Sequence, residues 1–227
     1  MGGRQQFFRA RLAAVILGPR RPTDRQVAER AAGVPLFIEE TVKMILESGP
    51  GHAPVIPGTL QNPLAARLDA LGEVKELAQL ASVVSLGGEF SFALLRAVTQ
   101  EDEESLRVAL DELVRAELLY ERGALSDSVY VFKHARIRET AYGSLLRSTR
   151  RRFHARVAEV LEEAFPEKVE NEPELVAQHL AEAGLTLDAI RHWQQAGERA
   201  LRAWATEEAT THFERGLELL TSVPKGQ

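Results

Sequence analysis

The spacing of apolar residues changes twice along this chain, and that change limits the folds that the chain can adopt. From residue 59 to residue 117, leucines and alanines recur at the i, i+3 and i+4 positions of amphipathic helices. The pattern then alternates in the two runs LLYERG and VYVFKH, as in β-strands, with the turn-like segment ALSDS between them. Helical spacing returns at Ala135 and continues to the end, with short breaks at Pro166 and Pro173. The sequence therefore predicts a mainly α fold that contains one β-hairpin.

The region around this hairpin has the element order of a winged-helix domain, in which several short helices precede a two-stranded hairpin. Four helical segments come before the hairpin: TLQNPLAARLDALG, EVKELAQLASVVSLGG, FSFALLRAVT and residues 101–117. His134 ends the second strand and directly precedes another helix. We therefore assign residues 59–147 to a winged-helix domain.

Residues before this domain form helical patterns that proline and glycine interrupt. The second pattern, AAGVPLFIEETVKMILESG, has a turn at Gly33 and Pro35 and then apolar residues at helical spacing. Residues 51–58 are rich in proline and glycine, which is typical of a linker. We predict a helical region over residues 1–50 and a linker over residues 51–58.

Residues after the domain, 148–227, carry a faint internal repeat. DAIRHWQQAGERAL and EATTHFERGLELL align about twenty residues apart, so that Trp193 corresponds to Phe213 and Ala196 to Gly216. Small residues at fixed positions allow helices to approach closely, while the aromatic rings fill the space between them. We predict antiparallel helical repeats that are similar to tetratricopeptide (TPR) repeats, although the spacing is not a full TPR period.

The composition excludes several classes of protein. The chain contains no cysteine, which excludes a disulfide framework, a thiolate metal site and a cysteine nucleophile. Its longest apolar runs are far shorter than the roughly 20 residues that a membrane-spanning helix needs. The net charge of -5 gives no overall attraction to nucleic acid or to anionic lipid. We expect a cytoplasmic location and no membrane contact.

Motifs for nucleotide or metal chemistry are missing from the sequence. It contains neither a Gly-x4-Gly-Lys-Ser/Thr loop nor a His-Glu-x-x-His pair. Four scattered histidines are interpreted as solvated or at the edge of the core: His52, His179, His192 and His212. No nucleophile, base and orienting residue can be grouped from the sequence. We predict no catalytic residue, no metal site and no enzymatic activity for this chain.

Charge decides how the winged helix is interpreted, because DNA affinity depends on neutralising phosphates. Residues 60–147 contain ten Lys/Arg and fourteen Asp/Glu. The helix before the hairpin would be the recognition helix of a DNA-binding protein. Its only cations are Arg107 and Arg115, and its acidic residues include Glu103, Glu104, Asp111, Glu112 and Glu117. This balance disfavours nucleic acid as a partner. A winged-helix transcription regulator is kept as the alternative function.

Two features remain as candidate sites. An arginine cluster at the junction of two helices comprises Arg147, Arg150, Arg151, Arg152 and Arg156. It is either a solvated face that is favourable at the end of the preceding helix or a surface for an acidic or phosphorylated partner. His134 lies beside a helix N-terminus, which suits an anion such as a nucleotide phosphate, although a structural role is the alternative.

The segment FKHARIRETAYGSLLRSTRRRFHARVAEVLEE resembles the bacterial signal-transduction ATPases with numerous domains (STAND ATPases), particularly those fused to class III adenylate or guanylate cyclase domains. AAGVPLFIEETVKMILESG, IPGTLQNPLAARLDAL and EFSFALLRAV match this AAA-type family in the same order. The resemblance covers roughly residues 25–221. It implies that residues 1–50 are the remnant of an ATPase lid, followed by a winged helix and TPR-like repeats.

The resemblance also implies roles for three residues. In the family a Gly-x-Pro turn of the lid approaches the adenine, and a winged-helix histidine contacts the β-phosphate; these roles fall on Gly33, Pro35 and His134. Lys133 and Ala135 replace the Met and Asp that flank this histidine in related ATPases. The Walker residues that bind ATP and a cyclase domain are missing here. We therefore expect no cofactor for this chain alone, ATP or ADP for the complete proteins, and an ATPase core in cis or trans.

The function implied by the resemblance is regulatory. The helical repeats are expected to bind a protein partner or effector, and the winged helix is expected to couple this binding to the nucleotide state of the ATPase core. The chain itself is expected to be a non-catalytic scaffolding segment, a fragment or a truncated gene product.

Overall fold

Most of the predicted winged helix and the helical tail can be described residue by residue. The computed structural model describes residues 61–86, 88–123 and 128–222. The expected lid remnant over residues 1–50, including Gly33 and Pro35, lies outside the described residues. So does the predicted linker over residues 51–58. These assignments remain predictions.

The chain is divided into two compact units, residues 1–70 and residues 71–227. The described part of the first is α4 (Gln61–Ala70), whose Leu64 and Leu68 are buried and lie one helical turn apart. The second unit holds both the remaining winged-helix elements and the helical tail. These two parts therefore pack together as one body.

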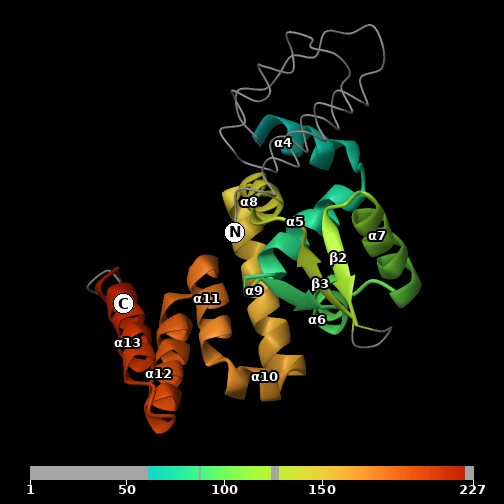
Figure 1. Cartoon of the computed structure of the whole chain (residues 1–227). Coiled ribbons are helices and arrows are strands. Elements are labelled where there is room, and N and C mark those ends of the chain that lie inside the picture. Colours follow the sequence, from blue (N-terminus) through green and yellow to red (C-terminus); the bar gives the residue numbers. More distant parts are fainter. Residues whose placement is uncertain (1–60, 87, 124–127, 223–227) are drawn as a thin grey trace, which may run out of the picture. The chain divides into compact units, whose positions relative to one another are not determined.

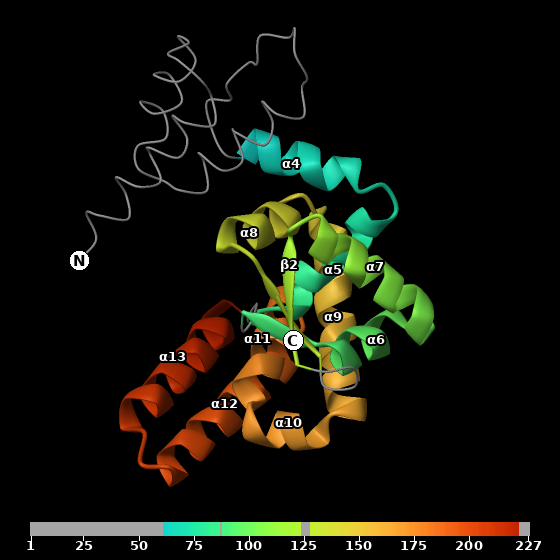
Figure 2. The same ribbon diagram turned by 45° about the vertical axis from the view of Figure 1, so that its right-hand side comes forward.

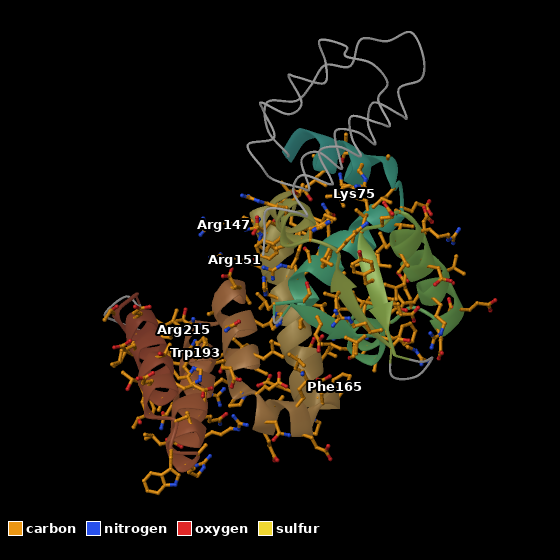
Figure 3. All side chains as sticks on the ribbon, viewed as in Figure 1. Lys75, Arg147, Arg151, Phe165, Trp193 and Arg215 are labelled. Atoms are coloured by element: carbon orange, nitrogen blue, oxygen red, sulfur yellow. The ribbon has the colours of Figure 1, made fainter. Side chains whose placement is uncertain are left out.

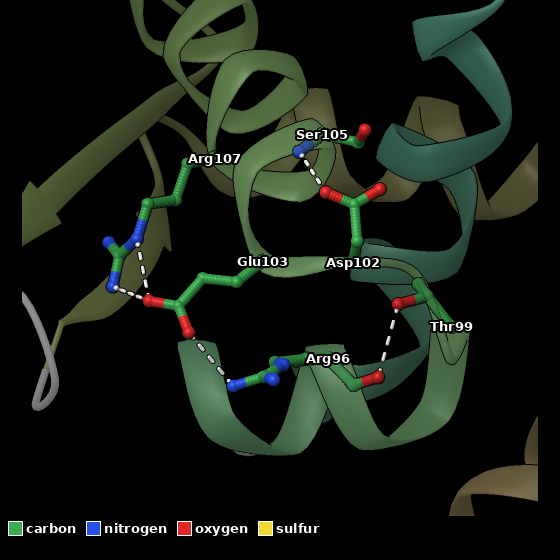
Figure 4. Close-up of polar contacts among 6 residues, drawn as sticks. All are labelled: Arg96, Thr99, Asp102, Glu103, Ser105 and Arg107. Carbon is green, nitrogen blue, oxygen red and sulfur yellow. Dashed lines mark hydrogen bonds and ion pairs between the residues drawn. The ribbon is translucent and has the colours of Figure 1, made fainter.

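The first three helices of the second unit are α5 (Val74–Val84), α6 (Phe92–Thr99) and α7 (Glu103–Arg115), and short polar side chains cap the last two of them. Ser91 Oγ accepts a hydrogen bond from the backbone N–H of Leu94 at 3.2 Å, and Asp102 Oδ1 accepts one from Ser105 at 2.9 Å. Such N-caps satisfy amide groups that have no partner inside the helix (Figure 4). The three helices correspond to three of those predicted before the hairpin.

A small antiparallel sheet follows from the predicted hairpin and one further strand. The strands are β1 (Glu89–Ser91), β2 (Leu119–Arg122) and β3 (Val129–Phe132), in the order β1-β3-β2. Phe90 of β1 lies opposite Tyr130 of β3, and their rings stack with centroids 5.7 Å apart. The sequence analysis included part of β1 in a helix, because three residues are too few to establish an alternating pattern. The order of helices and strands from α5 to β3 is that of a winged-helix domain.

In the described residues the sheet is followed by the helices α8 (Ala135–Gly143), α9 (Arg147–Ala164), α10 (Pro166–Asn171), α11 (Pro173–Ala183), α12 (Thr186–Arg202) and α13 (Thr206–Ser222), which Figure 1 labels. Pro166 and Pro173 occupy the first turns of α10 and α11, where the backbone N–H that proline lacks would have no partner inside the helix. Gly184 has a φ of 84° and ends α11. The two prolines therefore divide the tail where the sequence predicted breaks, and Gly184 adds a division that was not predicted.

The helix α9 connects the winged-helix elements to the tail. It packs against α5 and α6 and also against α10 and α11 (Figures 1 and 2). Its residues Val157, Ala158 and Leu161 are fully buried at i, i+1 and i+4. The stretch from α8 to α9 is thus the structural junction of the second unit.

The last two helices pack closely, as the internal repeat predicted. A Cβ atom placed on Gly197 of α12 would lie 2.5 Å from the ring of Phe213 on α13, so only glycine fits at this contact. The ring of Trp193 stacks on His212 at 5.5 Å between centroids, and Gly216 lies directly against Trp193. Small residues and aromatic rings therefore alternate across this helical hairpin.

The protein is mainly α, with a small three-stranded antiparallel sheet in the described residues. Across residues 61–86, 88–123 and 128–222, no helix has both the length and the apolar character needed to cross a membrane.

Candidate functional site

His134 lies at the junction that the sequence indicated, as the N-cap residue between β3 and α8. Its backbone carbonyl accepts a hydrogen bond from Ile137 N–H at 3.0 Å, but its side chain caps no amide. Nε2 of the ring is buried and has no hydrogen-bond partner among the described residues. His134 thus has an unused polar atom beside a helix N-terminus. Gly33 and Pro35, which were predicted to contact the same nucleotide as His134, lie outside the described residues.

The five arginines of the predicted cluster all lie on α9, but they do not form one surface. At 100° per residue, Arg147 and Arg151 project from one side of the helix, and Arg152 and Arg156 project from the opposite side. Arg147 and Arg151 are exposed and lie near each other in Figure 3. The predicted partner surface is therefore divided into smaller groups.

Arg150, the fifth member, makes contacts inside the second unit. Its Nη2 donates to the backbone oxygen of Tyr142 at 3.0 Å, and its guanidinium lies 4.1 Å from the centre of the Tyr142 ring. Its Nε is buried without a partner among the described residues. Arg150 therefore fixes α8 to α9 and is not a free cation for a partner.

Arg152 and Arg156 line a cleft of about 540 Å³ formed by α5, α6, α7 and α9. Glu73, Glu76 and Glu101 line the same cleft. Arg156 also forms an ion pair with Glu159, which is half exposed. The two arginines thus lie in a region of mixed charge, which weakens the case for an anion-binding patch on this side of α9.

A buried chain of hydrogen bonds joins α8, α9 and α11. Nδ1 of His154 on α9 lies 2.9 Å from Nδ1 of His179 on α11, and both side chains are fully buried. The hydroxyl of Tyr142 on α8 lies 3.0 Å from Nε2 of His154 and donates to Glu182 Oε2 at 3.3 Å. Glu182 is exposed on α11. The chain therefore runs from a buried histidine pair to a carboxylate at the surface.

The hydrogens of these bonds can be assigned so that every donor has an acceptor. The hydroxyl hydrogen of Tyr142 is donated to Glu182, so its oxygen accepts from Nε2–H of His154. Nδ1 of His154 is then unprotonated and accepts from Nδ1–H of His179. This arrangement leaves Nε2 of His179 as a buried acceptor without a partner among the described residues. Every donor in the chain is thereby used.

Burial keeps both rings neutral. Desolvation, and then the positive charge of Arg150, lowers the pKa of His154 from 6.5 to about 4. Desolvation, and then the neighbouring His154, lowers the pKa of His179 to about 3. Burial also raises the pKa of Tyr142, so its hydroxyl keeps the hydrogen that it donates. This chain of hydrogen bonds is complete only while both histidines are uncharged.

This chain of hydrogen bonds was not predicted from the sequence. No role was predicted for His154, and the interpretation of His179 as solvated or at the core edge is wrong because His179 is fully buried. A signal did exist: His154 precedes Val157, Ala158 and Leu161 by three, four and seven residues, so it shares their apolar stripe. That spacing places the ring in the core but does not give its partner on α11.

The other two tail histidines form separate pairs with carboxylates. Nε2 of His192 lies 3.0 Å from Glu162 Oε1, and Nε2 of His212 lies 3.6 Å from Glu208 Oε1. In the described part of the chain, no group of three or more histidine, aspartate or glutamate side chains is arranged to hold a metal ion. These histidines link α9 to α12 and stabilise α13.

A groove of about 530 Å³ lies between the tail helices and the turn after α5. Glu182 lines it from α11, Trp193 from α12, and Arg215 and Glu218 from α13, while Leu86 lines it from the turn. The guanidinium of Arg215 lies 5.0 Å from the ring centre of Trp193 (Figure 3). Because Glu182 also accepts from Tyr142, this groove borders the end of the buried chain.

The face of α7 that a DNA-binding winged helix would use is acidic. Its exposed acidic residues are Glu103, Glu104, Asp111 and Glu112. Arg107 donates to Glu103 at 3.0 Å and lies 4.2 Å over the ring of Phe92, and Arg96 also donates to Glu103 (Figure 4). The cations on and near this helix are thus engaged within the domain.

No protein-family model matches the chain. An uncharacterized protein of Rhizobium meliloti (strain 1021) is 28% identical over 202 residues, which cover 83% of this chain and 19% of that protein. The chain therefore spans about a fifth of the length of this relative.

Proposed function

We propose that this chain is a non-catalytic relay and scaffolding segment, in which the tail helices bind a protein partner and the winged-helix region receives the effect of that binding. The observation that carries the proposal is the chain from Tyr142 through His154 to His179. It ties α8, next to His134, to α11, which lines the groove. A displacement of α11 therefore changes contacts at Tyr142 on α8, the helix that begins directly after His134.

The resemblance to STAND ATPases suggests what the relay controls. In that case the output is the nucleotide state of an ATPase core whose P-loop is not among these 227 residues, in a cytoplasmic signalling protein. One observation supports a contact between His134 and a phosphate: its buried Nε2 has no partner among the described residues. This chain alone would bind no cofactor tightly.

The relay can be tested with hydrogen exchange on the 227-residue chain. Tyr142→Phe removes the hydroxyl that joins His154 to Glu182. The amides of α8 and α11 are expected to lose protection together, while those of α7 keep theirs, because α7 does not contact the chain of hydrogen bonds. A loss of protection confined to α11 would mean that α8 is not coupled to the groove.

Calorimetry with ATP or ADP tests the nucleotide part of the proposal. We expect at most weak binding to this chain alone, and we expect His134→Ala to reduce whatever binding is found. Tight binding that is unchanged in the His134→Ala variant would remove His134 from the proposed contact and assign nucleotide binding to other residues.

A winged-helix transcription regulator is the second candidate, because the element order from α5 to β3 is that of a winged helix and because Arg147 and Arg151 are exposed on one side of α9. The acidic face of α7 opposes it. A gel shift with random duplex DNA at low salt distinguishes the two candidates. DNA binding that weakens steeply as salt rises, and that falls in an Arg147→Gln/Arg151→Gln variant, would favour the regulator.

A further inference from the structure

The groove between α11, α12, α13 and Leu86 has an apolar floor and a charged rim. Leu86 and the buried ring of Trp193 supply apolar surface, and Ala181 leaves space above α11. Glu182 and Glu218 are exposed on the helices at its two sides. A groove of this kind accommodates an apolar side chain of a bound segment together with one or two polar groups.

The charges of the rim indicate which polar groups these are. Among the described residues, neither Glu182 nor Glu218 has a cationic partner, and the only bond of the Glu182 carboxylate is the 3.3 Å bond from the neutral phenol of Tyr142. Arg215, the single cation in the lining, lies with its guanidinium over the ring of Trp193. Two carboxylates without a cation therefore face the groove.

We propose that this groove binds a basic segment of a protein partner, that Glu182 and Glu218 recognise its lysine or arginine, and that Glu182 communicates occupancy through Tyr142 to the buried histidine pair. This rests on the proposed relay function and adds the chemistry of the partner. An ammonium or guanidinium is a stronger partner for a carboxylate than a phenol is. A cation at Glu182 therefore competes with the Tyr142 hydroxyl.

The competition has a specific effect on the buried chain. While Tyr142 donates to Glu182, its oxygen accepts from Nε2–H of His154. When Glu182 turns to a cation, the hydroxyl hydrogen of Tyr142 is free to point at Nε2 of His154, which favours the tautomer with hydrogen on Nδ1. The bond between His154 and His179 would then reverse its donor and acceptor. Occupancy of the groove is thereby converted into a change at the α9–α11 junction.

A random dodecapeptide display library, selected on the immobilised 227-residue chain, tests the recognition. We expect the enriched peptides to share a lysine or arginine beside an apolar residue. Their affinity should fall about tenfold in Glu182→Gln and in Glu218→Gln, as for the loss of a charge-assisted hydrogen bond. Glu214→Gln is the matched control, because Glu214 is exposed on the same helix as Glu218 but does not line the groove.

Three outcomes would overturn the recognition. Enrichment of acidic peptides would assign the groove to Arg215, and enrichment of no sequence would leave it without a peptide ligand. Basic peptides whose affinity survives both Gln substitutions would bind elsewhere. None of these results contradicts the coupling of α8 to α11, which hydrogen exchange in Tyr142→Phe tests independently, so failure of the groove and failure of the relay can be distinguished.

Ring ¹⁵N chemical shifts of the histidines test the communication step. An enriched peptide at saturation should shift the ring nitrogens of His154 and His179 in the wild-type chain, since their tautomers change. The same peptide should leave them unchanged in Tyr142→Phe, although it still binds. Binding that depends on Glu182 without any change at His154 would overturn the communication step and leave the recognition standing.

Discussion

The α9–α11 contact and the α12–α13 contact join neighbouring helices of the same tail by different means. The first centres on His154 and His179, two fully buried rings that share one hydrogen bond. The second centres on Gly197 against the Phe213 ring, with Trp193 stacked on His212. The polar contact holds only while both rings are neutral, whereas the close apolar contact depends on shape. The first can therefore respond to a signal, and the second serves as a rigid support.

Acid should act on the first contact with the largest effect. Because the folded pKa values of His154 and His179 lie below 6.5, the unfolded chain takes up protons first as the pH falls. The contribution to the free energy of unfolding is complete above about pH 6.5 and declines toward pH 4, by about 2 kcal/mol for each histidine at pH 5. Urea unfolding at pH 7 and pH 5 measures this decline.

A double variant separates the histidine pair from other groups that titrate. Glutamine is neutral at every pH and can still form hydrogen bonds. In His154→Gln/His179→Gln the difference in stability between pH 7 and pH 5 should shrink by most of that amount. An unchanged difference would mean that other groups cause the acid sensitivity.

Adding one methyl group should disturb the second contact. In Gly197→Ala the new Cβ lies 2.5 Å from the Phe213 ring, and we expect a loss of about 2 kcal/mol in the free energy of unfolding. Gly143→Ala is the control, because its Cβ would meet no atom within 4 Å. Equal stabilities of the two variants in urea would show that the Phe213 ring moves aside freely.

Removal of one hydroxyl should weaken the first contact without affecting the second. Tyr142→Phe leaves Nε2 of His154 buried without a partner, which costs about 1.5 kcal/mol. The stability change should be smaller when the same substitution is made in a His154→Leu background, because leucine has no polar atom that could bond the hydroxyl. Additive effects in this double-mutant cycle would argue that the hydroxyl and the histidines act separately.

The smallest predicted effect concerns the turn between α12 and α13, where a substitution should increase the stability of the protein. Trp204 has a φ of 62° and is 92% exposed, so a bulky residue occupies a left-handed position without burying its ring. Trp204→Gly should raise the free energy of unfolding by about 1 kcal/mol. A thermal melt checks this, and a decrease in stability would show that the indole makes a stabilising contact in solution.

Local signals explain why much of the fold was predictable. The change from helical to alternating spacing located the hairpin between α7 and α8. Pro166, Pro173 and Gly184 mark helix boundaries, because their backbone preferences do not depend on tertiary contacts. The internal repeat also placed Trp193 and Phe213 at one helix contact. The strand β1 was missed because its three residues become a strand only by pairing with β3.

The candidate sites were less predictable, because they depend on residues far apart in the chain. The sequence gathers five arginines within ten positions, but the helical turn of α9 sends Arg147 and Arg152 to opposite sides. Conversely, His154 and His179 lie 25 positions apart, and only the packing of α11 on α9 brings their rings together.

The sequence by itself determined the mainly α class, the winged-helix order and the approximate positions of the helices before the hairpin, because periodicity and capping act over a few residues. Only the tertiary structure decided that a neutral histidine pair lies at the junction and that Glu182 belongs both to this pair's hydrogen-bond chain and to a groove. The physical reason is that burial, which sets the charge state of His154 and His179, is a property of the packed helices and not of the residues alone.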